Sequence, residues 1–302
     1  MTALSPATDL FKTNPISPFV ETGAYEAIWA EDEKATFKKV YQLLNRDRMP
    51  MRPSEIVDNE KSLSYAKKVW NRILSHGLKN VGVRVRGTFD YVKKLNDVEY
   101  PIEILYYQGN WEYVYHPNIV AVVGSRKVSE EGKLRTIKLV DYLVKKHNCA
   151  IASGLADGVD GIAHLRAIQQ KAITIGVIGT PLTDVYPKNH KALQEYIARN
   201  FLVISQIPVE RYYKQDFRMN RFFFPERNKI MSAISKATFI VEASDTSGSL
   251  IQARAALKQG RKLFILQSCF ENEAIIWPAK FEKLGAVRIR NFEDIDRHLF
   301  DE

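Results

Sequence analysis

The stretch IVAVVGSR, residues 119–126, decides the fold class of this chain. Its first five residues are too uniformly apolar for a strand with one face in water, so they fit a strand in a sheet covered on both sides. Gly124, Ser125 and Arg126 follow where that strand would end. In this setting Arg126 is either a solvated surface residue or a ligand for something bound beyond the strand.

Six further apolar runs of strand length follow, separated by amphipathic stretches long enough to be helices. They are CAIA (149–152), ITIGVI (173–178), FLVIS (201–205), ATFIV (237–241), KLFIL (262–266) and a short run at 286–289. Strand and helix alternating in this way predict an α/β fold with a doubly wound, mostly parallel, Rossmann-like sheet.

The segment before the first strand has a different pattern. Residues 1–24 contain Pro15 and Pro18 and no sustained periodicity, and we expect a loosely ordered leader. Apolar residues then recur at helical spacing, which predicts a small, mostly helical N-terminal module with its connection over residues 25–118. The remaining residues, 119–302, form the predicted Rossmann-like domain.

Composition limits the compartment and the partner. Of the 44 Lys and Arg residues, 28 lie in residues 118–302 with 20 of the 35 acidic residues, so 8 of the 9 net positive charges are there. An anionic partner is therefore expected on this part of the chain.

Cys149 and Cys269 lack metal-ligand spacing, and we expect buried thiols in a reducing compartment. No apolar run of about 18 residues and no export signal is present, so we expect a cytoplasmic protein without a membrane segment.

Four loops that follow predicted strands contain glycine or serine: GSRKVSEEG, SGLADGVDGIAH, GTPLTDVYPKNH and EASDTSGSL. The carboxyl ends of parallel strands share one edge of the sheet, where ligands bind. Glycine lets a backbone approach phosphate closely, although these glycines could instead serve only tight turns. None of the loops matches GxGxxG or GxxxxGK[ST], so no dinucleotide or Walker-type site and no cofactor is predicted.

Five blocks of the chain, taken in order, resemble the DprA/Smf family (DNA processing protein A). They are GSRKVSEEG, SGLADGVDGIAHLRAI, TIGVIGTPLTDVYPKNHKAL, FFFPERNKIMSAIS and VEASDTSGSLIQARAALKQGRKLFIL, and they cover about residues 119–268. The resemblance implies an extended Rossmann-like fold in a homodimer that binds single-stranded DNA. It also implies assistance in loading a RecA-type recombinase during natural transformation, and no enzymatic activity.

The chain departs from the family pattern at Gln206, at Gln252 and at Gln267-Ser268, where Glu, Thr and Pro-Gly are usual. We also expect no room for the C-terminal winged-helix domain that many members carry. The pathway therefore stays open between transformation or recombination and a phage, plasmid or defence role.

Matching the family motifs residue by residue, and adding the loop residues beside them, gives the candidate phosphate-binding residues. In that family the arginine of the Gly-Ser-Arg loop contacts the DNA backbone, which implies this role for Arg126. Asn189 is a possible helix N-cap, and Arg227 follows Pro225 near a predicted helix start. The full set is Gly124, Ser125, Arg126, Ser153, Gly154, Gly179, Lys188, Asn189, Arg227, Asn228, Ser247, Gly248 and Ser249.

Residues 210–229, ERYYKQDFRMNRFFFPERNK, interleave aromatic and basic side chains, which suits a strand whose bases stack while its phosphates are neutralised. Tyr212, Tyr213 and Phe217 are the candidates for base stacking. Phe223 and Phe224 lead directly into a predicted helix, and we expect them in the core.

Two other groups could suggest catalysis or metal binding. Asp160 and His164 stand four residues apart, and we interpret them as a hydrogen-bonded pair that braces a loop, since no third metal ligand is evident. Glu242 is interpreted as a loop anchor, because no carboxylate follows the SGS loop at a hydrolytic spacing. Two alternatives to DNA binding remain: a nucleotide-sensing or nucleotide-hydrolysing protein with a mononucleotide among Gly124, Gly154, Gly179 and Gly248, and a structural interaction module.

Overall fold

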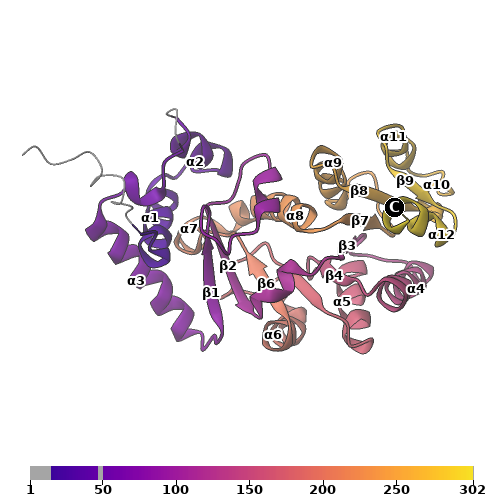
Figure 1. Ribbon diagram of the computed structural model, residues 1–302, viewed down its shortest axis with the longest axis horizontal. Helices are drawn as coiled ribbons and strands as arrows, with labels where there is room; N and C mark the ends of the chain where they lie inside the picture. Colours follow the sequence, from indigo (N-terminus) through magenta and orange to yellow (C-terminus); the bar gives the residue numbers. More distant parts are fainter. Residues whose placement is uncertain (1–14, 47–49, 302) are drawn as a thin grey trace, which may run out of the picture.

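One sheet of nine strands runs through the computed structural model, which describes residues 15–46 and 50–301 (Figure 1). The order is β1-β2-β6-β5-β4-β3-β7-β8-β9, parallel from β6 to β9, whereas β1 and β2 are antiparallel to their neighbours. The strands are β1 Val81–Val85, β2 Ile104–Gly109, β3 Ile119–Val123, β4 Ala150–Ser153, β5 Thr174–Val177, β6 Leu202–Ser205, β7 Ala237–Ile240, β8 Lys262–Leu266 and β9 Val287–Ile289. The predicted doubly wound, mostly parallel sheet is confirmed, and all seven apolar runs contain strands.

The direction of winding reverses at β3. From β3 the chain moves outward through β4, β5 and β6, then returns to the other side of β3 and continues through β7, β8 and β9. Val123 of β3 lies beside Ile240 of β7, so both strands end at the same level. Such a reversal separates the loops that follow the two strands and leaves a crevice between them.

Helices cover both faces of the parallel sheet. In Figure 1, α4, α5 and α6 lie below the sheet, and α8 and α9 lie above it. The helices of the core are α4 Glu130–His147, α5 Val159–Gln169, α6 Lys191–Asn200, α7 Val209–Lys214, α8 Phe223–Ile234, α9 Ser249–Lys258, α10 Gln267–Phe270, α11 Trp277–Lys283 and α12 Glu293–Ile295.

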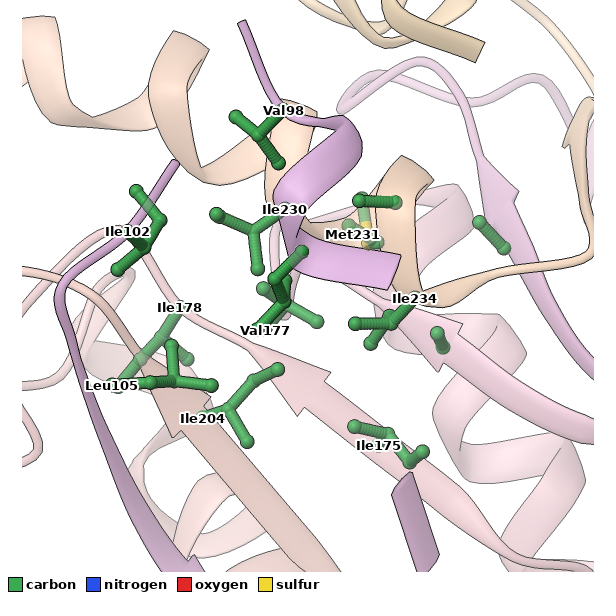
Figure 2. Close-up of a cluster of buried hydrophobic side chains, with 14 of the residues drawn as sticks. Val98, Ile102, Leu105, Ile175, Val177, Ile178, Ile204, Ile230, Met231 and Ile234 are labelled. Atoms are coloured by element: carbon green, nitrogen blue, oxygen red, sulfur yellow. The ribbon is translucent and has the colours of Figure 1, made fainter. Parts of the chain in front are cut away.

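Helix α8 is fixed to the sheet by its apolar face. Ile230, Met231 and Ile234 are fully buried and pack over the strands beside Val177 and Ile204 (Figure 2). Burying a side chain of this size stabilises the fold by about 1.5–3 kcal/mol. The N-terminal half of α8 is thereby held at the crevice, beyond the carboxyl ends of the strands.

The N-terminal helices are α1 Pro18–Glu31, α2 Phe37–Leu44 and α3 Asn59–Ser75. Helix α1 begins inside the predicted leader, because Ser17 caps it and Pro18 has the fixed φ suited to a first helical residue. The leader prediction is therefore wrong for residues 18–24, while residues 1–14 lie outside the described part. The stretch predicted as a connection forms β2, which pairs with β1 and β6, so the sheet crosses the predicted boundary at residue 118.

Glu26 joins the N-terminal helices to the core. Its carboxylate is fully buried and accepts hydrogen bonds from the Tyr106 hydroxyl and from the backbone N–H groups of Val209 and Glu210, at 2.8 and 2.9 Å. It therefore satisfies the N–H groups at the start of α7, which a helix cannot satisfy internally.

Across residues 15–46 and 50–301, no helix combines the length and apolar character needed to cross a membrane. Cys149 and Cys269 are both buried and free, as predicted.

Candidate nucleic-acid interface

A pocket of about 650 Å³ lies where the winding of the sheet reverses, beyond the ends of β3 and β7. We call it the switch-point pocket. Its walls are the Gly124–Lys127 loop, the start of α8, and the Ser244–Ser249 loop with the first turn of α9. Eight of the candidate residues line it: Gly124, Ser125, Arg126, Arg227, Asn228, Ser247, Gly248 and Ser249.

The charge of the pocket is positive. Arg126, Lys127 and Arg227 line it, against the single carboxylate of Asp160. Three cations and one anion leave a surplus of two positive charges in a concave site, where low-dielectric walls strengthen the field. The arrangement suits an anionic ligand.

Arg227 is the buried cation of this site, with 5% of its surface exposed. Its Nη1 donates to the Val177 carbonyl at 2.6 Å, and its Nε has no hydrogen-bond partner among the described residues. Burial lowers the pKa of Arg227 to about 10; the Asp160 charge opposes this shift and Arg126 adds to it. Arg227 is still protonated at neutral pH, and an anion in the pocket would offset the cost of burying it.

At three of the four candidate glycines, other parts of the protein occupy the space that a side chain would need. A methyl group at Gly124 would collide with Val159 and the Glu242 carbonyl, one at Gly154 with the Arg227 guanidinium, and one at Gly179 with the Phe224 ring. Gly154 and Gly179 also do not line the pocket. At these three positions glycine is needed for close packing within the protein, which neither the phosphate-approach nor the tight-turn prediction anticipated. At Gly248, a methyl group would meet no atom within 4 Å.

The loop before α9 is tied to α8. Asn228 donates through Nδ2 to the Gly248 carbonyl at 3.0 Å, and the hydroxyls of Ser247 and Ser249 are 2.7 Å apart. Ser125 shapes the opposite wall: its backbone N–H donates to the Glu242 carbonyl, and its hydroxyl bonds both backbone groups of Lys127. These contacts fix the positions of the walls before any ligand binds.

Arg126 lies over an aromatic surface at the rim. Its guanidinium is 5.8 Å from the centre of the Tyr186 ring, and that ring is 5.2 Å from Phe224. Tyr186 is about half exposed and was not a sequence candidate. Phe224 lines the pocket and is only partly buried, so its predicted place in the core is wrong, whereas Phe223 is buried. Consecutive aromatics at a helix start cannot all face inward, because successive side chains point in different directions.

The other candidates lie away from this pocket. Ser153 is fully buried and donates to the Val122 carbonyl, joining β4 to β3. Lys188 is exposed and paired with Asp184 at 2.5 Å. Asn189 donates to Asp157 instead of capping a helix, because α6 begins only at Lys191, after a turn of 3-10 helix; its predicted N-cap role is wrong.

The stacking candidates differ in their surroundings. The Tyr212 hydroxyl donates to Asp184 at 2.7 Å, and its ring stacks on Phe223. The Tyr213 ring is covered by the Arg72 guanidinium, 4.2 Å from its centre. Phe217 is 77% exposed, in a turn that also presents Phe222 and two arginines. Phe217 is thus the most accessible of the three, with Arg218 from the same turn 5.7 Å from its ring centre, whereas both tyrosines are held by residues from other elements.

Glu242 anchors a loop, as predicted, by accepting hydrogen bonds from the backbone N–H and the hydroxyl of Ser129 at 3.1 and 2.6 Å. The predicted bond between Asp160 and His164 is wrong. Asp160 accepts from the Gly154 N–H, and His164 bonds the Thr174 hydroxyl, since buried polar groups take whichever partner is adjacent. Within residues 15–46 and 50–301, no group of three or more potential ligands is placed to hold a metal ion.

A family model described as DNA recombination-mediator protein A matches residues 83–299. The chain is 39% identical over 163 residues to DNA processing protein DprA of Streptococcus pneumoniae, which is 54% of this chain and 55% of that relative. It is 28% identical over 277 residues to DprA of Bacillus subtilis, or 90% and 88% of the two chains. Protein Smf of Escherichia coli is 35% identical, but the match spans only 48% of its length.

Two solved structures have the same fold. DNA processing protein A from Streptococcus pneumoniae superposes with a TM-score of 0.66 at 26% identity, covering 94% of this chain and 93% of its own. DNA processing protein A from Helicobacter pylori superposes with a TM-score of 0.62 at 30% identity, covering 75% and 98%. The Helicobacter structure concerns the single-stranded DNA binding mode of that protein.

Proposed function

Because this chain belongs to the family of DNA recombination-mediator protein A, we propose that it binds single-stranded DNA and holds the phosphate backbone in the switch-point pocket. The observation that carries the proposal is the surplus of positive charge in this pocket, with the buried Arg227 at its wall. Arg126 contacts phosphate at the rim, where a guanidinium can form two parallel hydrogen bonds.

The preference for single strands rests on the exposed aromatic groups. Tyr186 lies beside Arg126. Phe217 and Phe222 are exposed, and Arg218 and Arg221 lie near their rings. Stacking contributes about 1–3 kcal/mol per base and is available only where bases are unpaired. Phosphate contacts carry no base information, so sequence preference is weak.

The wider role is proposed from the family. The protein acts as a homodimer and assists loading of a RecA-type recombinase in DNA uptake or recombination. It does so without catalysis: Glu242, the carboxylate that could suggest hydrolysis, is engaged by Ser129. A cytoplasmic location is consistent with two free, buried thiols.

The competing function is the binding of a mononucleotide. The volume of the switch-point pocket supports it, because it lies in the range that holds a small ligand. One titration separates the two functions. A labelled oligo-dT is titrated with protein at about 150 mM salt, in parallel with the same length of duplex and with unlabelled mononucleotides as competitors. We expect tight binding of oligo-dT, weaker binding of duplex and negligible competition. Displacement of oligo-dT by stoichiometric mononucleotide, or equal affinity for duplex, contradicts the proposal.

A further inference from the structure

A second pocket, of about 780 Å³, lies where the N-terminal helices meet the Rossmann-like core. We call it the junction pocket. One wall is the turn from α3 to β1, residues 76–80, and the other walls are the loop 182–188 and helix α6. In Figure 1 that turn and α6 lie along the same lower edge of the molecule. The pocket therefore joins two parts of the chain that are far apart in sequence.

The charges of the junction pocket do not cancel. Lys188 pairs with Asp184 at 2.5 Å, and Lys191 lies 3.9 Å from Glu195, so both acidic residues of the lining are matched by a lysine. Lys79 and Arg199 remain. Both are exposed, and neither side chain has an ion pair or a hydrogen bond within residues 15–46 and 50–301.

These two cations come from different elements, Lys79 from the turn before β1 and Arg199 from the end of α6. They leave the lining with a surplus of two positive charges, which a bound anion would offset. A chain of phosphates supplies such an anion at each nucleotide. On the same lining, the Asn80 amide and the Gln108 Oε1 can hydrogen-bond bases or sugars, while the Gln108 Nε2 donates to the Lys79 carbonyl at 3.0 Å.

The loop 182–188 connects the two pockets. Tyr186 faces the switch-point pocket, through contacts with Arg126 and Phe224, while Lys188, two residues later, lines the junction pocket. An extended DNA strand that leaves Arg126 therefore meets the Tyr186 ring and then Lys188. Beyond them it reaches the cations of the junction pocket.

We propose that single-stranded DNA held in the switch-point pocket continues across Tyr186 and Lys188 into the junction pocket, where Lys79 and Arg199 each contact a phosphate. This inference rests on the proposed function. It gives the N-terminal part of the chain a direct role in binding, and it makes affinity depend on strand length: a short oligonucleotide fills the first pocket, and a longer one fills both.

The test compares a double variant, Lys79→Ala with Arg199→Ala, with the unchanged protein on oligo-dT of about 6 and about 20 nucleotides. The first is near the short end of typical single-strand site sizes and the second exceeds them. The slope of log K against log salt should become shallower by about 1.4 for the longer strand, from two lost phosphate contacts, and stay unchanged for the shorter one. A matched control, Lys138→Ala with Lys258→Ala, removes two exposed lysines that line neither pocket and should leave both slopes unchanged.

Several outcomes overturn the inference while leaving the proposed function intact. In the first, the double variant has the same salt slope as the unchanged protein on both oligonucleotide lengths. In the second, it loses affinity equally for both lengths and also melts at a lower temperature. Loss of binding to a poly-glutamate peptide with unchanged oligo-dT binding would assign the pocket to an acidic protein segment instead. Failure of the unchanged protein to bind either oligonucleotide contradicts the proposed function itself.

Discussion

The guanidinium of Arg227 occupies the space beside Gly154 that any larger side chain at that position would need. Gly154 donates its N–H to Asp160 at 3.1 Å, and Arg227 donates to the Val177 carbonyl at 2.6 Å. One glycine therefore allows a buried cation from α8 to lie against the loop that follows β4. The wall of the switch-point pocket depends on this contact.

Replacing Gly154 with alanine should displace Arg227 and break its bond to Val177. We expect the free energy of unfolding to fall by about 1–3 kcal/mol, the usual cost of leaving a buried polar group unsatisfied. Affinity for oligo-dT should fall as well. Urea unfolding and a DNA titration on the same sample measure both effects. An unchanged free energy of unfolding and an unchanged affinity would mean that Arg227 adopts another side-chain conformation without loss.

Gly248→Ala is the counterpart of Gly154→Ala, at a glycine that has no neighbour to displace. The residue has φ −61°, which alanine adopts freely, and open space around it. The free energy of unfolding should change by less than about 1 kcal/mol. DNA affinity should nevertheless fall, because Gly248 lines the switch-point pocket and a methyl group there would take up space that a phosphate needs. Unchanged affinity would place the phosphates away from the Ser247–Ser249 loop.

Arg126→Ala should weaken binding to all single-stranded sequences by a similar factor, because a backbone contact carries no base information. The slope of log K against log salt should become shallower by about 0.7 for one lost phosphate contact. Lysine at this position should recover part of the affinity, since it keeps the charge without the planar fork. Titrations at four salt concentrations with two oligonucleotide sequences measure both quantities.

The same variant should keep its melting temperature. The Arg126 guanidinium faces the Tyr186 ring and makes no hydrogen bond or ion pair with the part of the chain that the structure describes. Earlier melting with an unchanged salt slope would show that Arg126 braces the neighbouring loops and does not hold DNA.

Local pattern was sufficient to predict the parallel strands. A run such as Ile119–Val123 is buried on both faces, so its composition alone distinguishes it from a half-exposed strand. The antiparallel strands β1 and β2 carry no such uniformly apolar signal. Tyr107 and Gln108 are polar or amphipathic and only partly buried, and β2 is a strand because it pairs with β6, nearly 100 residues away.

The site was predictable where motif order brings loops to one edge of the sheet, as for Arg126, Arg227 and Gly248. Burial and pairing were not predictable. Nothing in the sequence shows that Gly154 packs against a guanidinium, or that Asn189 bonds Asp157. The YPKNH motif identifies Lys188 and not Tyr186 as a phosphate ligand, although an aromatic residue beside a predicted phosphate loop is a usable signal for base stacking.

Phe217→Ala should lower affinity for single strands and leave duplex binding unchanged. The ring is 77% exposed, so its removal costs little stability, whereas the loss of one stacked base corresponds to about 1–3 kcal/mol of binding free energy. Tyr212→Ala is the contrasting variant: it removes a ring packed on Phe223 and a hydroxyl bonded to Asp184, and should lower the melting temperature. Equal loss on duplex and single strand for Phe217→Ala would exclude base stacking.

The stability of the junction between the N-terminal helices and the core should depend on pH through Glu26. Burial raises the pKa of this carboxyl to about 7, against the lowering effect of the hydrogen bonds from Tyr106, Val209 and Glu210. The folded state therefore keeps a proton that the unfolded chain releases near its ordinary pKa of about 4.3. The stabilising contribution is complete below about pH 4.3, falls as pH rises toward 7, and is gone above about pH 7, with a total of up to about 4 kcal/mol.

Glu26→Gln should remove this part of the pH dependence, because an amide does not titrate. Urea unfolding at several values between pH 5 and pH 8 measures it as the difference between the two proteins. The difference isolates Glu26 from other buried groups, such as His164, whose pKa burial lowers to about 3 and which destabilises the fold only as pH falls. Glu31→Gln, an exposed change on the same helix, should keep the unchanged protein's profile. If Glu26→Gln and the unchanged protein lose stability in parallel from pH 5 to 8, then Glu26 is ionised throughout, and its three hydrogen bonds outweigh its burial.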